Sequence, residues 1–230
     1  MFLLRPSVVR FAAAVYIFRA GMNSIPIPRT GRQALKTQRT RARLIDATLA
    51  LIRDRGFAAA TASRIARRAG VTWGAAQHQF GSKEDILEAI LALAYARFID
   101  AMNAPALRHG SRGARARLFV RLMWMHYQGD HYRVSLEILR ATRGARQRRA
   151  RAWEQRQGRA HLRVVREVFH ESHLSDAQLR EALTFTHCCL TGLSIERIFE
   201  SRVRHIERHL QRIARALEQM LAGPRTASGA

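Results

Sequence analysis

Two side chains in the first part of the 230-residue chain have chemistry suited to binding another molecule. The Gln77 amide can donate and accept hydrogen bonds at the same time, a pattern that fits the edge of an adenine base or a phosphate. The Lys83 ammonium falls in the first turn of an expected helix, where free backbone N–H groups also attract anions. Since a cation opposes the helix dipole there, Lys83 favours a phosphate contact, and a solvated lysine is the alternative.

The sequence does not indicate an enzyme. Catalysis needs a nucleophile with a base, paired carboxylates or ligands at metal-binding spacing, and the nearest approach is His187 beside Cys188. Neighbouring residues in a helix point about 100° apart, so this pair does not form a dyad. Cys188 and Cys189 are adjacent, which favours buried thiols in a reducing cytoplasm, with a thiol or metal sensor as the alternative. We therefore expect no metal and no cofactor.

The charge of the chain indicates a polyanionic partner. There are 40 Lys and Arg against 17 Asp and Glu, for a net charge of +23, and 15 of the basic residues lie within residues 1–83. Such a surface attracts nucleic acid first and an anionic membrane second. All the basic residues are Arg except Lys36 and Lys83. Because a GC-rich gene produces this skew without selection for binding, the position of the charge is more informative than its total.

The first residues are unusual for a cytoplasmic protein. Residues 2–20 are apolar but include three arginines, and the longest uncharged run, residues 11–18, is too short to span a bilayer. The stretch resembles a poor signal peptide without a clear cleavage site. We expect a dispensable extension, with Met22 as an alternative start, and a cytoplasmic protein with no membrane partner. A protein bound to the membrane surface is the alternative.

Apolar residues recur at helical spacing from residue 28 almost to the end, and no stretch sustains a period of two. This pattern predicts an all-α fold. Ser82 and Ser175 are predicted to cap helices, with Asp85 and Gln178 in the capping-box position. The expected helices cover about 37–55, 61–70, 72–80, 82–102, 114–128, 131–143, 145–173, 175–200 and 202–221.

Residues 61–80 are predicted to form two short helices around a tight turn. Thr61 is a good N-cap, Ala66 is small where two helices cross, and Gly70 suits a positive φ after the last turn. Apolar residues stand where the pair would rest on the first helix: Ile65, Ala69, Val71 and Ala76. This is helix-turn-helix chemistry, which presents the start of the second helix outward.

Together with the following turn, Phe80 to Leu87, this segment resembles the TetR family of one-component transcriptional regulators over residues 37–93. The resemblance implies a three-helix DNA-binding domain at 37–83, after an extension at 1–36. A larger helical ligand-binding and dimerisation domain would follow at 84–222, with a tail at 223–230. It further implies a homodimeric repressor that a small-molecule effector releases from a palindromic operator. A basic helical protein bound to membrane surfaces or to nucleic acid without specificity is the alternative.

The resemblance also assigns the contacts with double-stranded DNA. Thr61 and Lys83 would bind phosphates, Arg41 would belong to an arm that reaches the minor groove, and the others would face the major groove. The family commonly has Tyr where this chain has Gln77, so base preference differs here. Packing of Trp73 on the first helix is its alternative role. The DNA-contact set is Arg41, Thr61, Thr72, Trp73, Gln77, His78 and Lys83.

The second domain would hold the effector. A stripe on the helix expected at 114–128, with inward-facing residues of later helices, suggests a medium-sized apolar ligand carrying a few polar groups. A core histidine bonded to a neighbour is the alternative for His126, and Trp124 is expected on the outer face. The predicted pocket residues are Phe119, Leu122, Met123, His126, Tyr127, Phe169, Phe185 and Cys189.

The last two expected helices would form the dimer interface. Apolar residues alternate three and four apart in the final helix, which is typical of a narrow seam against another helix. Closure of the subunit's own core is the alternative. The predicted interface residues are Leu190, Leu193, Val203, Ile206, Leu210, Ile213 and Leu217.

Overall fold

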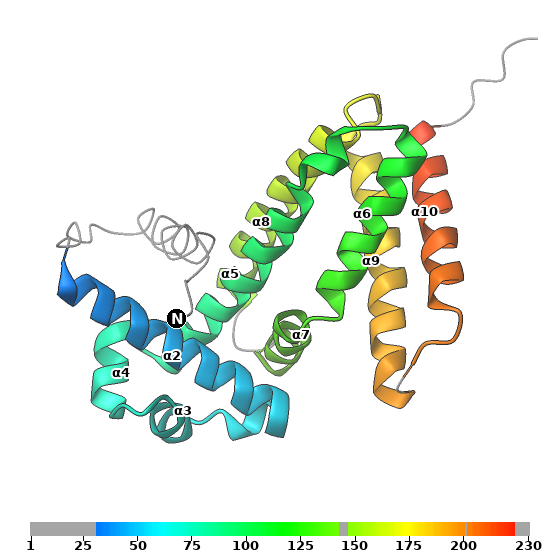
Figure 1. The fold of residues 1–230 in the computed structure, drawn as a ribbon. Helices are drawn as coiled ribbons and strands as arrows, with labels where there is room; N and C mark the ends of the chain where they lie inside the picture. The colour runs from blue at the N-terminus through cyan, green and yellow to red at the C-terminus, as the bar shows by residue number, and fades with distance from the viewer. Residues whose placement is uncertain (1–30, 143–146, 201, 224–230) are drawn as a thin grey trace, which may run out of the picture. The chain divides into compact units, whose positions relative to one another are not determined.

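The computed structural model describes residues 31–142, 147–200 and 202–223, and all regular structure within these ranges is helical (Figure 1). The prediction of an all-α fold is confirmed. Most of the expected extension and tail, including Met22, lies outside the described residues. The elements are α2 (Arg32–Arg55), η1 (Phe57–Ala59), α3 (Ala62–Ala69), α4 (Trp73–Phe80), α5 (Lys83–Met102), η2 (Pro105–Arg108), α6 (Arg112–Tyr127), α7 (Asp130–Thr142), α8 (Gln147–Val168), α9 (Asp176–Phe199) and α10 (Ile206–Ala222).

The chain divides into two compact units. Unit 1 comprises Met1–Ala96 and Asp130–Ala145, and unit 2 comprises Arg97–Gly129 and Arg146–Ala230. Helix α5 begins in the first unit and ends in the second. Helix α7 belongs to unit 1 because its acids bind the end of α2: the Phe57 N–H donates to Glu137 at 2.5 Å, and Arg53 pairs with Asp130 at 3.2 Å.

Unit 1 is built on α2, against which α3 and α4 pack. Leu44 and Ile52 of α2, Ile65 of α3 and Ala76 and Phe80 of α4 are buried. Burial of this apolar face is the main stabilising contribution to such short helices, since an isolated helix of their length is marginal in water.

The local structure at α3 and α4 follows from their caps. The Thr61 hydroxyl accepts from the Arg64 N–H at 3.4 Å, and the Thr72 hydroxyl accepts from the Ala75 N–H at 3.2 Å. Between them Gly70 takes a left-handed conformation with φ of 65°, which closes α3 and turns the chain into α4. The turn therefore lies where the sequence predicts it.

Unit 2 is arranged around α6, which packs against both α10 and α9. The rings of Phe119 and Phe169 meet edge to face at 5.6 Å in its core. Because α6 has neighbours on two sides, Trp124 is only 7% exposed, and the expected outer position of Trp124 is wrong. None of the described helices is long and apolar enough to cross a membrane.

Candidate nucleic-acid interface

Helix α4 presents polar side chains to solvent along one side. Thr72, Gln77 and His78 are exposed, whereas Trp73 is partly buried. The opposite side of α4 is held in the core of unit 1 by Ala76 and Phe80. The structure thus exposes three of the predicted DNA-contact residues on α4 and its N-cap, and Trp73 lies beside them partly buried.

The first turn of α4 also carries two small residues that the sequence reasoning missed. Gly74 and Ala75 are exposed, and a Cβ added at Gly74 would meet no atom within 4 Å. Without longer side chains, this turn leaves the backbone and the Thr72 cap accessible to a large partner. The signal was present in the sequence as two small residues that follow Trp73 in the first turn after the capping Thr72.

Arg41 occupies a different position from the one expected. Its guanidinium lies 3.8 Å from the centroid of the Phe80 ring and donates a hydrogen bond to the Gln79 carbonyl. Arg41 therefore fastens the C-terminal end of α4 to α2, because cation–π attraction and a charged hydrogen bond act on the same group. Arg39 and Arg43, its neighbours two positions away on α2, are exposed, and Arg43 reaches the Gly70 carbonyl at 3.3 Å.

Lys83 begins α5 beside a reciprocal cap. The Asp85 N–H donates to the Ser82 hydroxyl at 3.1 Å, and the Ser82 N–H donates to the Asp85 carboxylate at 3.0 Å. The Lys83 ammonium lies 4.8 Å from the centroid of the Phe57 ring. This cation–π contact orients the ammonium, and the Lys83 side chain as a whole is half-buried. Thr61, the other predicted phosphate contact, is exposed at the start of α3.

A second candidate group lies in unit 2, where Phe98 of α5 meets two histidine rings and a third histidine meets Tyr127. The Phe98 ring is 5.3 Å from the His126 ring and 4.7 Å from the His161 ring, both edge to face. The Tyr127 hydroxyl is hydrogen-bonded to Nδ1 of His187. We call these five residues the histidine cluster. His126 and Tyr127 were expected here, and the other three were missed.

Two imidazoles of the histidine cluster have a lowered pKa. Burial, and secondarily the nearby His187 and His126, lowers the pKa of His161 from 6.5 to about 4. Burial also lowers the pKa of His187. An available signal was the spacing of His161 with Val164, Val165 and Val168, which places a polar ring on the apolar face of α8.

The other predicted pocket residues are divided between the core and the surface. Phe119, Met123 and Phe169 are buried, and Leu122 and Cys189 are partly buried. Burial and the adjacent Cys188 raise the pKa of the Cys189 thiol. Phe185 does not face inward: it is 39% exposed, on the outer side of α9. Within the described ranges, no group of three His, Cys, Asp or Glu could hold a metal ion.

Most of the predicted dimer residues lie inside unit 2. Four of them are buried where α6, α9 and α10 pack together: Leu190, Leu210, Ile213 and Leu217. This burial favours the alternative role, closure of the subunit's own core. Leu193 and Ile206 are partly buried. Val203 precedes α10, because the chain reverses at His205 with φ of 53° and the helix begins at Ile206.

Two capped helices packed on a third, with one side of the second helix exposed, define a helix-turn-helix protein. Residues 44–90 match the family described as bacterial regulatory proteins, tetR family. The helix-turn-helix part of the chain therefore matches the TetR family.

Relatives and solved structures resemble different shares of the chain. The chain is 40% identical over 78 residues to the HTH-type transcriptional regulator BetI 2 of Chromohalobacter salexigens, a match that spans 34% of this chain and 36% of the relative. A TetR-family regulator from Mesorhizobium loti, described as putative in its own name, has a TM-score of 0.63 at 16% identity, covering 81% of this chain and 97% of that one. The multidrug binding protein EbrR, solved with imidazole, has a TM-score of 0.57 at 18% identity, covering 82% and 98%. The family match therefore lies within unit 1, and the structural similarity extends the shared fold over most of the chain.

Proposed function

We propose that the protein is a sequence-specific DNA-binding transcriptional regulator, acting as a homodimeric repressor that a small-molecule effector releases from its operator. The observation that carries this proposal is the exposed side of α4, with Thr72, Gln77 and His78 directed to solvent above a buried anchor. In this arrangement Gln77 reads a base edge, and Thr61 and Lys83 bind phosphates on either side. The family match at residues 44–90 includes this helix, and the relative BetI 2 is named as a transcriptional regulator.

A second copy of the chain is proposed to cover the outer side of α9. Phe185, Ile195 and Phe199 are 39%, 43% and 78% exposed, and Cys188 and Gly192 complete a stripe with alternating spacings of three and four residues. This spacing lets two helices pack along a narrow seam. The proposed interface is therefore this α9 stripe rather than the buried leucines of α9 and α10.

The effector is proposed to bind at the histidine cluster. Imidazole and phenol groups among apolar neighbours suit an apolar molecule with a few hydrogen-bonding groups. EbrR, a structural neighbour, was solved with a small heterocycle bound, which supports the general capacity of the fold. Helix α5 carries Phe98 of the cluster at one end and Lys83 at the other, so a ligand that moves Phe98 acts on the element that follows α4. Effector and DNA affinities are then coupled through two populations of α5.

The proposal is tested by selecting bound duplexes from a random pool with the purified full-length protein. We expect an enriched near-palindrome, bound far more tightly than unselected DNA at the same salt concentration. Gln77→Ala should relax base preference at one position in each half-site, at a cost of about 1–3 kcal/mol against the wild-type site. Arg180→Ala, an exposed change on α9, is the matched control. Equal affinity for random and enriched duplexes would contradict the proposal.

A further inference from the structure

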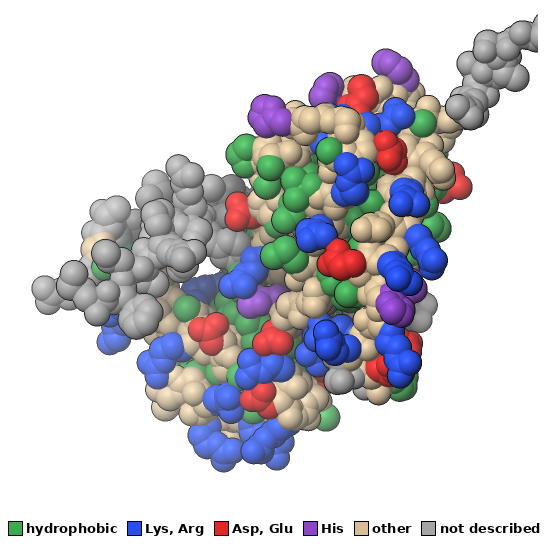
Figure 2. Space-filling view, turned by 45° about the vertical axis from the view of Figure 1, so that its right-hand side comes forward, with side chains coloured by type: hydrophobic (Ala, Val, Ile, Leu, Met, Phe, Trp, Pro, Cys, Tyr) green, Lys and Arg blue, Asp and Glu red, His purple; other side chains and the backbone are tan. Residues whose placement is uncertain are grey.

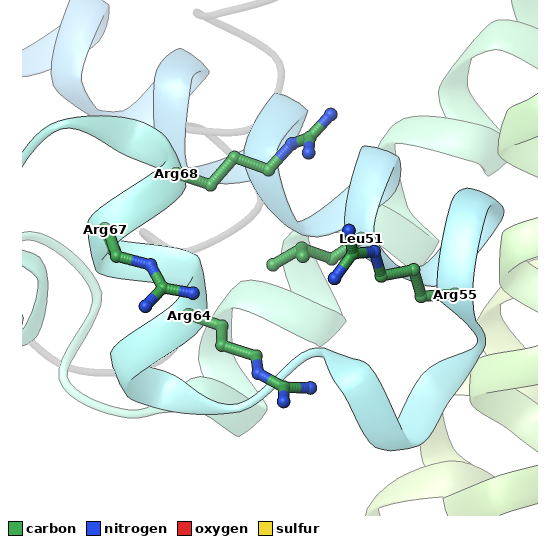
Figure 3. Close-up of a pocket in the computed structure, with 5 residues that line it drawn as sticks. All are labelled: Leu51, Arg55, Arg64, Arg67 and Arg68. Carbon is green, nitrogen blue, oxygen red and sulfur yellow. The ribbon is translucent and has the colours of Figure 1, made fainter.

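Four arginines of unit 1 converge on one hollow outside α4. Arg55 from the end of α2 and Arg64, Arg67 and Arg68 from α3 surround a space of about 250 Å³, with Leu51 as its apolar wall (Figure 3). Figure 2 shows Lys and Arg side chains gathered at the lower end of this unit, at the height of α3 in Figure 1. We call these four residues the arginine cluster.

The acids near the arginine cluster neutralise only part of its charge. Asp54 pairs with Arg68 at 3.5 Å but also with Arg53 at 2.8 Å, and its lowered pKa is due first to Arg53. Among the residues that the structure describes, Arg64 and Arg67 have no ion pair. The hollow is therefore lined by guanidinium groups in excess of carboxylate, an arrangement that an anion stabilises.

Helix stability explains only some of these arginines. Arg55, Arg67 and Arg68 lie in the last turns of their helices, where a cation is favourable. Arg64 lies in the first turn of α3, which contains no acid, so its charge opposes the helix dipole. Arg64 is thus the member of the cluster whose position favours ligand binding over helix stability.

The arginine cluster is continuous with the surface that carries α4. A neighbouring hollow of about 480 Å³ is lined by Ser63, Arg67, Val71 and Trp73, among others, so Arg67 belongs to both hollows. The two hollows therefore form a continuous surface from Trp73 of α4 to the end of α2, and its basic part begins at Arg67 of α3. Its charges are spread along an open surface, as the regularly spaced phosphates of a duplex require.

We propose that the arginine cluster binds the phosphate backbone of DNA beyond the base pairs that α4 reads, which lengthens the protein's footprint. This inference rests on the proposed function, since it needs a duplex already held by α4. A compact free anion is the less suitable ligand, because the hollow has an apolar Leu51 wall and its polar groups are long side chains. A duplex instead meets several guanidinium groups at once, and Arg is well suited to phosphate geometry.

The test compares two duplexes that carry the same selected site, one ending at its borders and one with about ten more base pairs of unrelated sequence on each side, roughly one helical turn. The variant is R55Q/R64Q/R67Q. The control is R117Q/R163Q/R180Q, which removes the same charge from exposed positions of unit 2. Wild type and control should bind the longer duplex more tightly, and R55Q/R64Q/R67Q should not distinguish the two.

The dependence of affinity on salt gives a second readout. On the longer duplex, the slope of log affinity against log salt concentration should be shallower in R55Q/R64Q/R67Q by about 2.7 for each bound subunit, from three lost phosphate contacts. Arg64→Gln alone should lower the slope by about 0.9 and keep the helical circular dichroism of wild type, which separates binding from folding.

Three outcomes would decide the matter. An equal gain from the flanks in wild type and R55Q/R64Q/R67Q overturns the inference. The inference is also overturned if R55Q/R64Q/R67Q binds both duplexes like wild type but loses affinity for inorganic tripolyphosphate, the free-anion probe. The ligand of the arginine cluster would then be a small anion. Absence of any preference for a selected site in the wild type is a failure of the proposed function instead, and is seen before the flanks are compared.

Discussion

His161 should make the stability of the protein depend on pH. Its pKa in the folded chain is about 4, against 6.5 for an ordinary histidine, because burial disfavours the charged ring. Below pH 6.5 the unfolded chain takes up a proton that the folded chain does not, so the free energy of unfolding falls as the pH falls towards 4. This difference in pKa corresponds to about 3 kcal/mol of folding free energy, all of which is present above pH 6.5.

The assay is urea unfolding followed by circular dichroism at several pH values between 7 and 4. His161→Phe keeps a ring beside Phe98 but cannot be protonated, so the loss of stability over this range should be smaller by about 3 kcal/mol. His109→Gln, a change at an exposed histidine, should leave the wild-type dependence intact. An identical pH dependence in His161→Phe and wild type refutes the reasoning, as does an NMR titration of His161 with a midpoint near 6.5.

Three further changes test other parts of the structure. Arg41→Met should lower the free energy of unfolding by about 1–2 kcal/mol, measured in urea, because the contact with Phe80 and the bond to the carbonyl are lost. Ser82→Ala should cost about 1 kcal/mol in the same assay, since the Asp85 N–H loses its cap. Phe199→Lys should shift the protein from dimer to monomer in sedimentation, because the change places a charge on the α9 stripe.

Each change has an outcome that contradicts it. An Arg41→Met variant as stable as the exposed control Arg39→Met would show that the stacked guanidinium contributes nothing. Wild-type stability in Ser82→Ala would mean that Asp85 alone suffices for the cap. A dimer that survives Phe199→Lys at micromolar concentration would place the interface elsewhere.

Local signals in the sequence predicted unit 1 more fully than unit 2. Thr61, Gly70 and Thr72 act through bonds to near neighbours, so their residue types predict where α3 and α4 begin and end. Helical spacing shows which residues are apolar, but not how many neighbouring helices will cover them. Trp124 was misplaced for that reason, because α9 and α10 both pack on α6.

The same limit explains the candidate sites. The exposed side of α4 follows from short-range packing and was predicted. The histidine cluster is formed by residues of four helices. No spacing in the sequence indicates that His161 and His187 lie close together, because they belong to different helices. Phe185 was assigned to the interior because it is aromatic, yet the α9 stripe on which it lies has no cover within the described chain.

The placement of α7 affects the order in which the two units can fold during synthesis. Unit 1 needs Glu137 and Asp130 to bind Phe57 and Arg53, but residues 97–129 of the other unit are translated before them. During synthesis on the ribosome, unit 1 is therefore completed only after residues 97–129 of unit 2 have been made. The two units are therefore completed together, and a gene fragment cut after Ala96 encodes unit 1 without α7.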